Sequence, residues 1–236
     1  MATPSCDSKL EVLEMSLTLF FSPAVIPFTV TTLCNSPITD LILTNTSLTA
    51  MQWSTLFRHL SFWHLLSLQV DGSCPTYSLV KFLAHHNVRN LTFSQGHTTV
   101  LCSSHVPVCL PLPSLEHLNG SPACIHSLVS FATLPTTLES LTVRFYQSSS
   151  EVPLLEEVLA CAAYFPELNE LHMCIPTEID CCLLETPRQP VPSCLVKTLF
   201  LMCHDLAKCD MIVHFIVMYA LSLNDMTPDS HTMLPG

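Results

Sequence analysis

The residue types best suited to chemistry gather in the segment HTTVLCSSHVPVC. Two histidines and two cysteines lie close together there, at His97, Cys102, His105 and Cys109. Imidazole nitrogen and thiolate sulfur are ligands that Zn²⁺ prefers, so the segment could hold a zinc ion. Its spacing does not match a zinc finger, and a chain with 13 Cys and 12 His produces such clusters by chance. We therefore expect no metal site and interpret the cysteines as small buried hydrophobic residues.

Catalytic arrangements are not recognisable in the sequence. No serine lies in a G-x-S-x-G turn, and no cysteine stands at an expected helix start beside a general base. Glu178 and Asp180 lie two residues apart, but nothing indicates an acidic group opposite them, so we expect a solvated loop. The 4 Gly are too widely separated for a phosphate-binding loop or a dinucleotide fingerprint. We expect neither enzymatic activity nor a cofactor.

The composition excludes two classes of protein. With 8 Lys+Arg against 19 Asp+Glu, the formal net charge is -11, which leaves no broad cationic surface for a nucleic-acid backbone. Hydrophobic residues make up 49% of the chain and charged residues only 11%, a composition that opposes intrinsic disorder. We therefore expect a folded chain that does not bind nucleic acid.

Two apolar stretches raise the question of a membrane. The uncharged segment Met15–Thr39 is interrupted by three prolines, and the apolar segment Met211–Leu223 falls short of the ~20 residues that cross a bilayer. We expect buried elements and no membrane partner. The odd number of cysteines and a charged N-terminus without a secretory signal favour the cytoplasm or the nucleus.

The secondary-structure elements that would position a functional site follow a repeated sequence pattern. The pattern L-x-x-L-x-L, the strand segment of a leucine-rich repeat, first stands out in ITDLILTNTSL, where Thr46 replaces the usual asparagine. Six copies follow it, namely LLSLQV, VRNLTF, LEHLNG, LESLTV, LNELHM and VKTLFL, and a weaker one precedes it at Leu10, Leu13 and Met15. The second apolar positions lie 23 to 30 residues apart, at Leu41, Leu68, Leu91, Leu118, Leu141, Leu171 and Leu199. This spacing predicts one strand per repeat.

Helical patterns lie between these strands. In TAMQWSTLFRHL, Thr49 and Gln52 predict a capping box, and apolar residues keep helical spacing at Trp53, Leu56, Phe57 and Leu60. A second amphipathic segment is EVPLLEEVLACAAYF, with one apolar side formed by Leu155, Val158, Leu159 and Ala162. A shorter helix is expected near Tyr77–Ala84, and Ser94–Pro113 reads as a long loop.

The alternation of strands and helices predicts an α/β fold. We expect a leucine-rich-repeat solenoid of about seven irregular repeats, with short parallel strands on the concave face and helices or loops on the convex face. Residues 1–37 would form an N-terminal cap or partial repeat, residues 38–206 the repeats, and residues 207–236 an apolar helix with a short tail. The alternative is an unrelated α/β domain with leucine-rich parallel strands.

Two segments carry a resemblance to a known family. NTSLTAMQWSTLFRHLSFWHLLSLQVDGSCPTYSLVKFLAHH and LPSLEHLNGSPACIHSLVSFATLPTTLESLTV look like the leucine-rich-repeat portion of fungal F-box-like proteins, and the resemblance covers Leu10–Leu206. In that family an F-box docks to a ubiquitin-ligase scaffold, and the repeats offer a surface that captures a substrate. The resemblance therefore implies the substrate-recognition part of a ubiquitin ligase adaptor. The F-box itself is not visible in the sequence, and the family offers no catalytic residues to transfer.

An interaction surface follows from the strand alternation. Successive side chains leave opposite faces of a strand, so the residues beside the core leucines should line the concave face. We expect a non-enzymatic module that binds a protein partner through Asp40, Thr44, Gln69, Asp71, Asn90, Thr92, His117, Asn119, Thr142, Arg144, Glu170, His172 and Phe200. A zinc-stabilised or membrane-associated protein is one alternative, and a degenerate repeat fragment without independent function is another.

Overall fold

The structure, a computed structural model, forms two compact units, Met1–His105 and Val106–Gly236. The residues that it describes are 11–16, 18–94, 109–135, 137–145, 158–159, 162, 165, 167–175, 197–203 and 213. Each unit combines parallel strands with helices, so the expected α/β class is confirmed.

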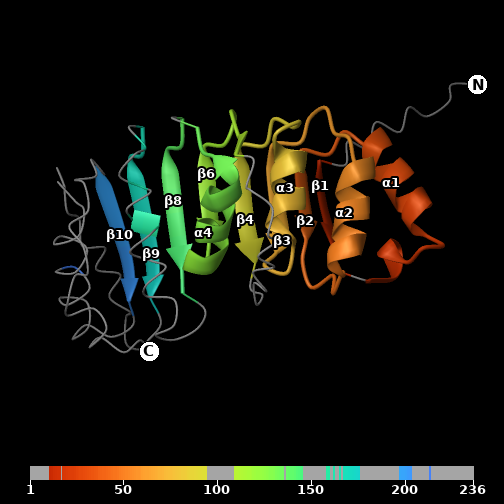
Figure 1. Cartoon of the computed structure of the whole chain (residues 1–236), viewed down its shortest axis with the longest axis horizontal. Coiled ribbons are helices and arrows are strands. Elements are labelled where there is room, and N and C mark those ends of the chain that lie inside the picture. Colours follow the sequence, from red (N-terminus) through yellow and green to blue (C-terminus); the bar gives the residue numbers. More distant parts are fainter. Residues whose placement is uncertain are drawn as a thin grey trace, which may run out of the picture. The chain divides into compact units, whose positions relative to one another are not determined.

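Unit 1 contains four parallel strands that neighbour one another in chain order (Figure 1). They are β1 (Val12–Met15), β2 (Asp40–Leu43), β3 (Ser67–Asp71) and β4 (Asn90–Ser94). The register pairs Leu41 with Leu68 and Leu68 with Leu91, which are equivalent positions of the repeat pattern. The weak N-terminal copy is also a strand, because β1 pairs with β2 and sets Leu13 beside Leu41.

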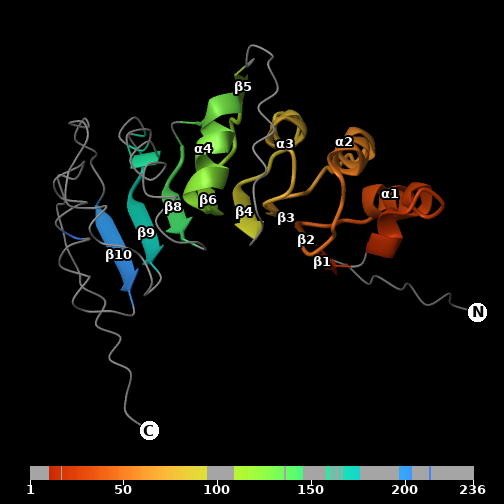
Figure 2. The same ribbon diagram turned by 60° about the horizontal axis from the view of Figure 1, so that its bottom comes forward.

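The helices of unit 1 cover one side of these strands. They are the short 3-10 helix η1 (Thr18–Phe21) and the α-helices α1 (Ile26–Asn35), α2 (Ala50–His59) and α3 (Thr76–Leu83). Figure 2 shows α1, α2 and α3 on the same side of β1–β4. Except for Leu13 of β1, which is half-buried, the leucines and other apolar residues of the strands that point to this side are buried. They form the core with the inner faces of the helices.

Helix α2 begins with the predicted capping box. The Thr49 hydroxyl accepts a hydrogen bond from the backbone N–H of Gln52 at 3.3 Å, and the Gln52 side chain accepts one from the backbone N–H of Thr49 at 2.9 Å. These bonds satisfy backbone donors that a helix start otherwise leaves unpaired. The apolar face predicted for this helix is also confirmed, since Trp53, Leu56 and Phe57 are buried.

Unit 2 repeats the arrangement with four parallel strands in the order β6-β8-β9-β10. These are β6 (His117–Gly120), β8 (Ser140–Arg144), β9 (Glu170–Ile175) and β10 (Thr198–Cys203). Two very short strands, β5 (Leu110–Pro111) and β7 (Ala132–Thr133), form a separate parallel pair. β5 lies inside the segment that was expected to be a loop, and residues 95–108 of that segment are outside the described residues.

Helix α4 (Pro122–Phe131) follows β6 and was not predicted. Its start has a cap, because the Ser121 hydroxyl accepts a hydrogen bond from the Cys124 N–H at 3.3 Å, and Pro122 occupies the first turn. Of the second predicted amphipathic segment, Val158, Leu159 and Ala162 are helical and buried as expected, whereas Leu155 lies outside the described residues. The predicted C-terminal helix also lies outside the described residues, except for Val213, which is helical.

No helix among the described residues has the length and hydrophobicity needed to span a bilayer.

Candidate functional site

The strands of unit 1 leave one side uncovered by described helices, which we call the open face of unit 1. Its side chains alternate with the buried core residues, as the sequence pattern predicts. They are half-buried and comprise Asp40, Ile42, Ser67, Gln69, Asn90, Thr92 and Ser94. The parallel register sets them in rows across the sheet, so that Ile42, Gln69 and Thr92 are direct neighbours.

Thr44 and Asp71 are buried, although alternation predicts that their side chains are accessible on the open face. Their exposed fractions are only 8% and 6%. The chain turns sharply after β2, where Asn45 and Ser47 have φ values of 53° and 50° in the left-handed region. Thr44 lies directly before this turn, where the extended backbone ends and alternation no longer predicts which way a side chain points. Asp71 is still within the extended strand β3, and it is buried because residues of the turn bond to its carboxylate.

The Asp71 carboxylate instead ties the turn to the end of β3. One oxygen accepts hydrogen bonds from the Thr46 N–H at 3.0 Å and the Thr46 hydroxyl at 2.9 Å. The other accepts the Asn45 N–H at 2.8 Å and the Ser94 hydroxyl at 3.3 Å. A buried carboxylate is tolerated when donors surround it, so Asp71 is a structural residue of the sheet edge.

Unit 2 has an equivalent open face. Its candidate residues are His117, Asn119, Thr142, Arg144, Glu170, His172, Thr198, Phe200 and Met202. The register sets Asn119, Thr142, His172 and Phe200 in one row across the four strands. Three predicted residues that were far apart in the sequence, Thr142, His172 and Phe200, therefore become neighbours.

An aromatic pair stands out on this face. The rings of His172 and Phe200 are stacked, with centroids 4.3 Å apart and an angle of 14° between the planes. His172 Nε2 lies 3.3 Å from a carboxylate oxygen of Glu170 on the same strand, which holds the ring in place. Met202 follows on β10 with an exposed fraction of 61%. The pair and Met202 form a partly apolar patch with a carboxylate beside it, a composition typical of binding surfaces.

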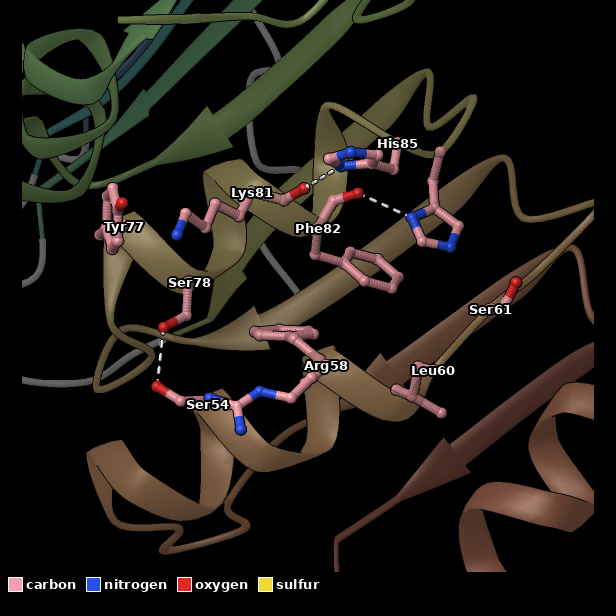
Figure 3. A pocket seen from close by; sticks show the side chains of 11 residues that line it. Ser54, Arg58, Leu60, Ser61, Tyr77, Ser78, Lys81, Phe82 and His85 are labelled. Carbon is pink, nitrogen blue, oxygen red and sulfur yellow. Dashed lines mark hydrogen bonds between the residues drawn. The ribbon is translucent and has the colours of Figure 1, made fainter. Parts of the chain in front are cut away.

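Sequence reasoning missed a pocket on the helical side of unit 1, between α2 and α3 (Figure 3). The pocket has a volume of about 630 Å³ and is lined by Ser54, Phe57, Arg58, Leu60, Ser61, Tyr77, Ser78, Lys81, Phe82, His85 and His86. One sequence feature indicates a cationic surface in this region: the segment from Gly72 to Leu115 contains Lys81 and Arg89 but no carboxylate. The sequence alone does not indicate that Arg58 of the preceding helix lines the same pocket as Lys81.

His85 and His86 lie just beyond the end of α3, the helix that the sequence predicts near Tyr77–Ala84. Nδ1 of His85 lies 2.8 Å from the carbonyl oxygen of Lys81, and Nδ1 of His86 lies 2.7 Å from that of Phe82. The contact with Lys81 satisfies a carbonyl at the helix end, whereas the Phe82 carbonyl also accepts the backbone N–H of His85 at 3.1 Å. Burial, aided by the neighbouring His85, lowers the pKa of His86 below its ordinary value of 6.5, although its bond to the Phe82 carbonyl acts in the opposite direction.

The candidate zinc ligands are mostly outside the part of the chain that the structure describes. Cys109 is described and exposed, whereas His97, Cys102 and His105 lie outside it. Glu178 and Asp180 also lie outside it. Within the described residues, no group of three or more His, Cys, Asp or Glu side chains is arranged to hold a metal ion.

Comparison with known proteins finds no family model that matches this chain and no curated protein that matches it. The function must therefore be argued from the surfaces themselves.

Proposed function

We propose that the chain is a non-enzymatic leucine-rich-repeat protein that binds a protein partner on its open strand faces. One observation carries the proposal: within each unit the parallel register aligns half-exposed side chains in rows, on the side of the strands away from the described helices. A partner that follows such rows would contact residues from several repeats at once.

The open faces are suited to binding because their backbone is already ordered. Every strand is hydrogen-bonded to its neighbours, and the alternate side chains, such as Leu68 and Leu141, are anchored in the core. Binding to a preformed surface avoids much of the entropy loss that accompanies the ordering of a loop. The remaining cost falls on side chains, and the short Ser, Thr and Asn side chains lose little rotamer freedom.

The apolar patch of unit 2 is the part that we expect to contribute most to affinity. A few residues usually supply most of the binding energy, and these are commonly large side chains that become fully buried in the complex. Phe200, His172 and Met202 are the described open-face residues of unit 2 that fit this description best. Polar neighbours such as Thr142 would contribute mainly to specificity.

We further propose that the repeats form a solenoid. Each strand with its helix has an apolar side that it cannot bury alone, and stacking of successive repeats would bury it. The equal register of neighbouring strands within each unit supports this interpretation. The resemblance to the repeat portion of fungal F-box-like proteins extends the proposal to substrate recognition in a ubiquitin ligase adaptor, which predicts that a ligase scaffold is recovered together with the bound substrate.

The proposal is tested by affinity capture from cell extract with matched pairs of variants. The open-face variant is Gln69→Arg with Thr142→Arg, and the helix-side control is Thr55→Arg with Ser130→Arg, which adds the same bulk and charge at exposed positions. We expect the open-face variant to lose a specific partner that the wild type and the control retain. Retention of every partner by a folded open-face variant would refute the proposal.

A further inference from the structure

The pocket between α2 and α3 gathers positive charge on an acidic protein. Arg58 of α2 and Lys81 of α3 both line it. Between Asp40 and Glu116 the sequence contains only one carboxylate, Asp71. That carboxylate is buried and bonded to Thr46, so it does not neutralise the pocket. No carboxylate of the described residues pairs with Arg58 or Lys81.

Two phenylalanines line the pocket together with its polar groups. Phe57 and Phe82 pack with ring centroids 4.9 Å apart, and Phe82 stacks on His86 at 4.0 Å. In Figure 3 the Arg58 and Lys81 side chains extend toward the side where the Ser54 and Ser78 hydroxyls meet at 2.7 Å. The Lys81 ammonium also lies 4.4 Å from the centre of the Tyr77 ring, which holds the charge at the rim.

An exposed tryptophan lies close in sequence to the residues that line the pocket. Trp63, with an exposed fraction of 88%, lies two residues beyond the lining residue Ser61. Its neighbour Phe62 is buried and contacts Phe82 and His86 edge-on, with centroids 6.3 Å away in each case. The segment that carries Trp63 is therefore anchored to the pocket, and a ligand longer than a single anion could contact both.

We propose that this pocket binds an acidic peptide segment in which carboxylates flank one apolar side chain. Arg58 and Lys81 would bind the carboxylates, with Ser54 and Ser78 as further hydrogen-bond donors, and the apolar side chain would lie on Phe57 and Phe82. The volume of about 630 Å³ is sufficient for such a side chain and the adjoining backbone. The site is separate from the open face, because residues of α2 and α3 line it, and these helices cover one side of the strands (Figure 2).

The test uses the purified full chain and fluorescence anisotropy with a labelled peptide of sequence Glu-Glu-Phe-Glu-Glu. Two matched peptides, Gln-Gln-Phe-Gln-Gln and Glu-Glu-Gly-Glu-Glu, remove the charges and the apolar side chain in turn, and glutarate serves as a free dicarboxylate competitor. The variants Arg58→Gln and Lys81→Gln remove the proposed contacts. Arg89→Gln is the matched control, because Arg89 is exposed in the same unit but does not line the pocket.

We expect the Phe-containing acidic peptide to bind at least about fivefold more tightly than either matched peptide, and added salt to weaken it. Arg58→Gln and Lys81→Gln should each weaken binding by roughly three- to tenfold, whereas Arg89→Gln should change it by less than about twofold. Equal binding of the charged and neutral peptides, or an equal loss in Arg89→Gln, would overturn the proposal. The proposal would also be overturned if glutarate displaced the peptides and the Phe-containing and Gly-containing peptides bound with equal affinity, because the pocket would then be a site for free anions.

Discussion

The carboxylate of Asp71 should be essential to the stability of unit 1. In Asp71→Ala, the Thr46 N–H and hydroxyl, both buried, lose their acceptor, as does the Asn45 N–H. An unsatisfied buried donor costs about 1–3 kcal/mol, and the two on Thr46 would cost about 2–6 kcal/mol together. Removal of the buried charge offsets part of that cost. We therefore expect a loss of about 2–4 kcal/mol in the free energy of unfolding.

The loss can be measured by urea unfolding with tryptophan fluorescence, since Trp53 is buried in the same unit. Thr46→Val removes only the hydroxyl and should cost about 1 kcal/mol. Asp40→Ala is the control, because the Asp40 carboxylate is half-buried and accepts a bond from the adjacent Thr39 hydroxyl. If Asp71→Ala cost no more than Asp40→Ala, the assignment of Asp71 to a structural network would be wrong.

Three further predictions concern the helices and the core. Thr49→Ala should remove the cap of α2 and lower the free energy of unfolding by about 1 kcal/mol, while Thr55→Ala on the exposed side of the same helix should change it little; urea titration of both checks this. Leu141→Ala should cost about 2–5 kcal/mol because the side chain is buried, and an unchanged midpoint of thermal unfolding would contradict its place in the core of unit 2. His86 should make the free energy of unfolding depend on pH. Its pKa in the folded chain is lowered by burial and by His85, so the unfolded chain binds a proton at a higher pH than the folded chain does. Stability therefore falls as the pH drops below 6.5. His86→Gln should show a smaller loss between pH 7.5 and 5.5, and an identical loss would show that other groups cause it.

The sequence predicts the strands well because their pattern is local and repeated. Each L-x-x-L-x-L copy places two apolar side chains on one face, and the structure buries them, as at Leu68 and Val70. The capping box at Thr49 is equally local, since its two partners are three residues apart. Features of this kind require no knowledge of neighbouring repeats.

The features that the sequence did not predict depend on tertiary structure. The burial of Asp71 depends on the turn at Asn45 and Thr46 in the preceding repeat, whose backbone N–H groups bond to the carboxylate. Helix α4 is not predicted because its buried side includes Ser127 and the less buried positions include Val129 and Phe131, which weakens the contrast between its two faces. Ser121 followed by Pro122 is nevertheless a sequence typical of a helix start. The pocket between α2 and α3 could not be predicted, because Arg58 becomes a neighbour of α3 only when the helices pack.

The central claim, that the partner binds the open strand face, is tested most directly by site-specific photo-cross-linking in cell extract. A photoreactive benzoyl-phenylalanine would replace the long, exposed side chain of Arg144 on the open face of unit 2 or, as the control, Thr55 on the exposed side of α2. We predict that the partner identified by affinity capture is cross-linked from position 144 and not from position 55. Cross-linking from position 55 with none from position 144 would contradict the claim.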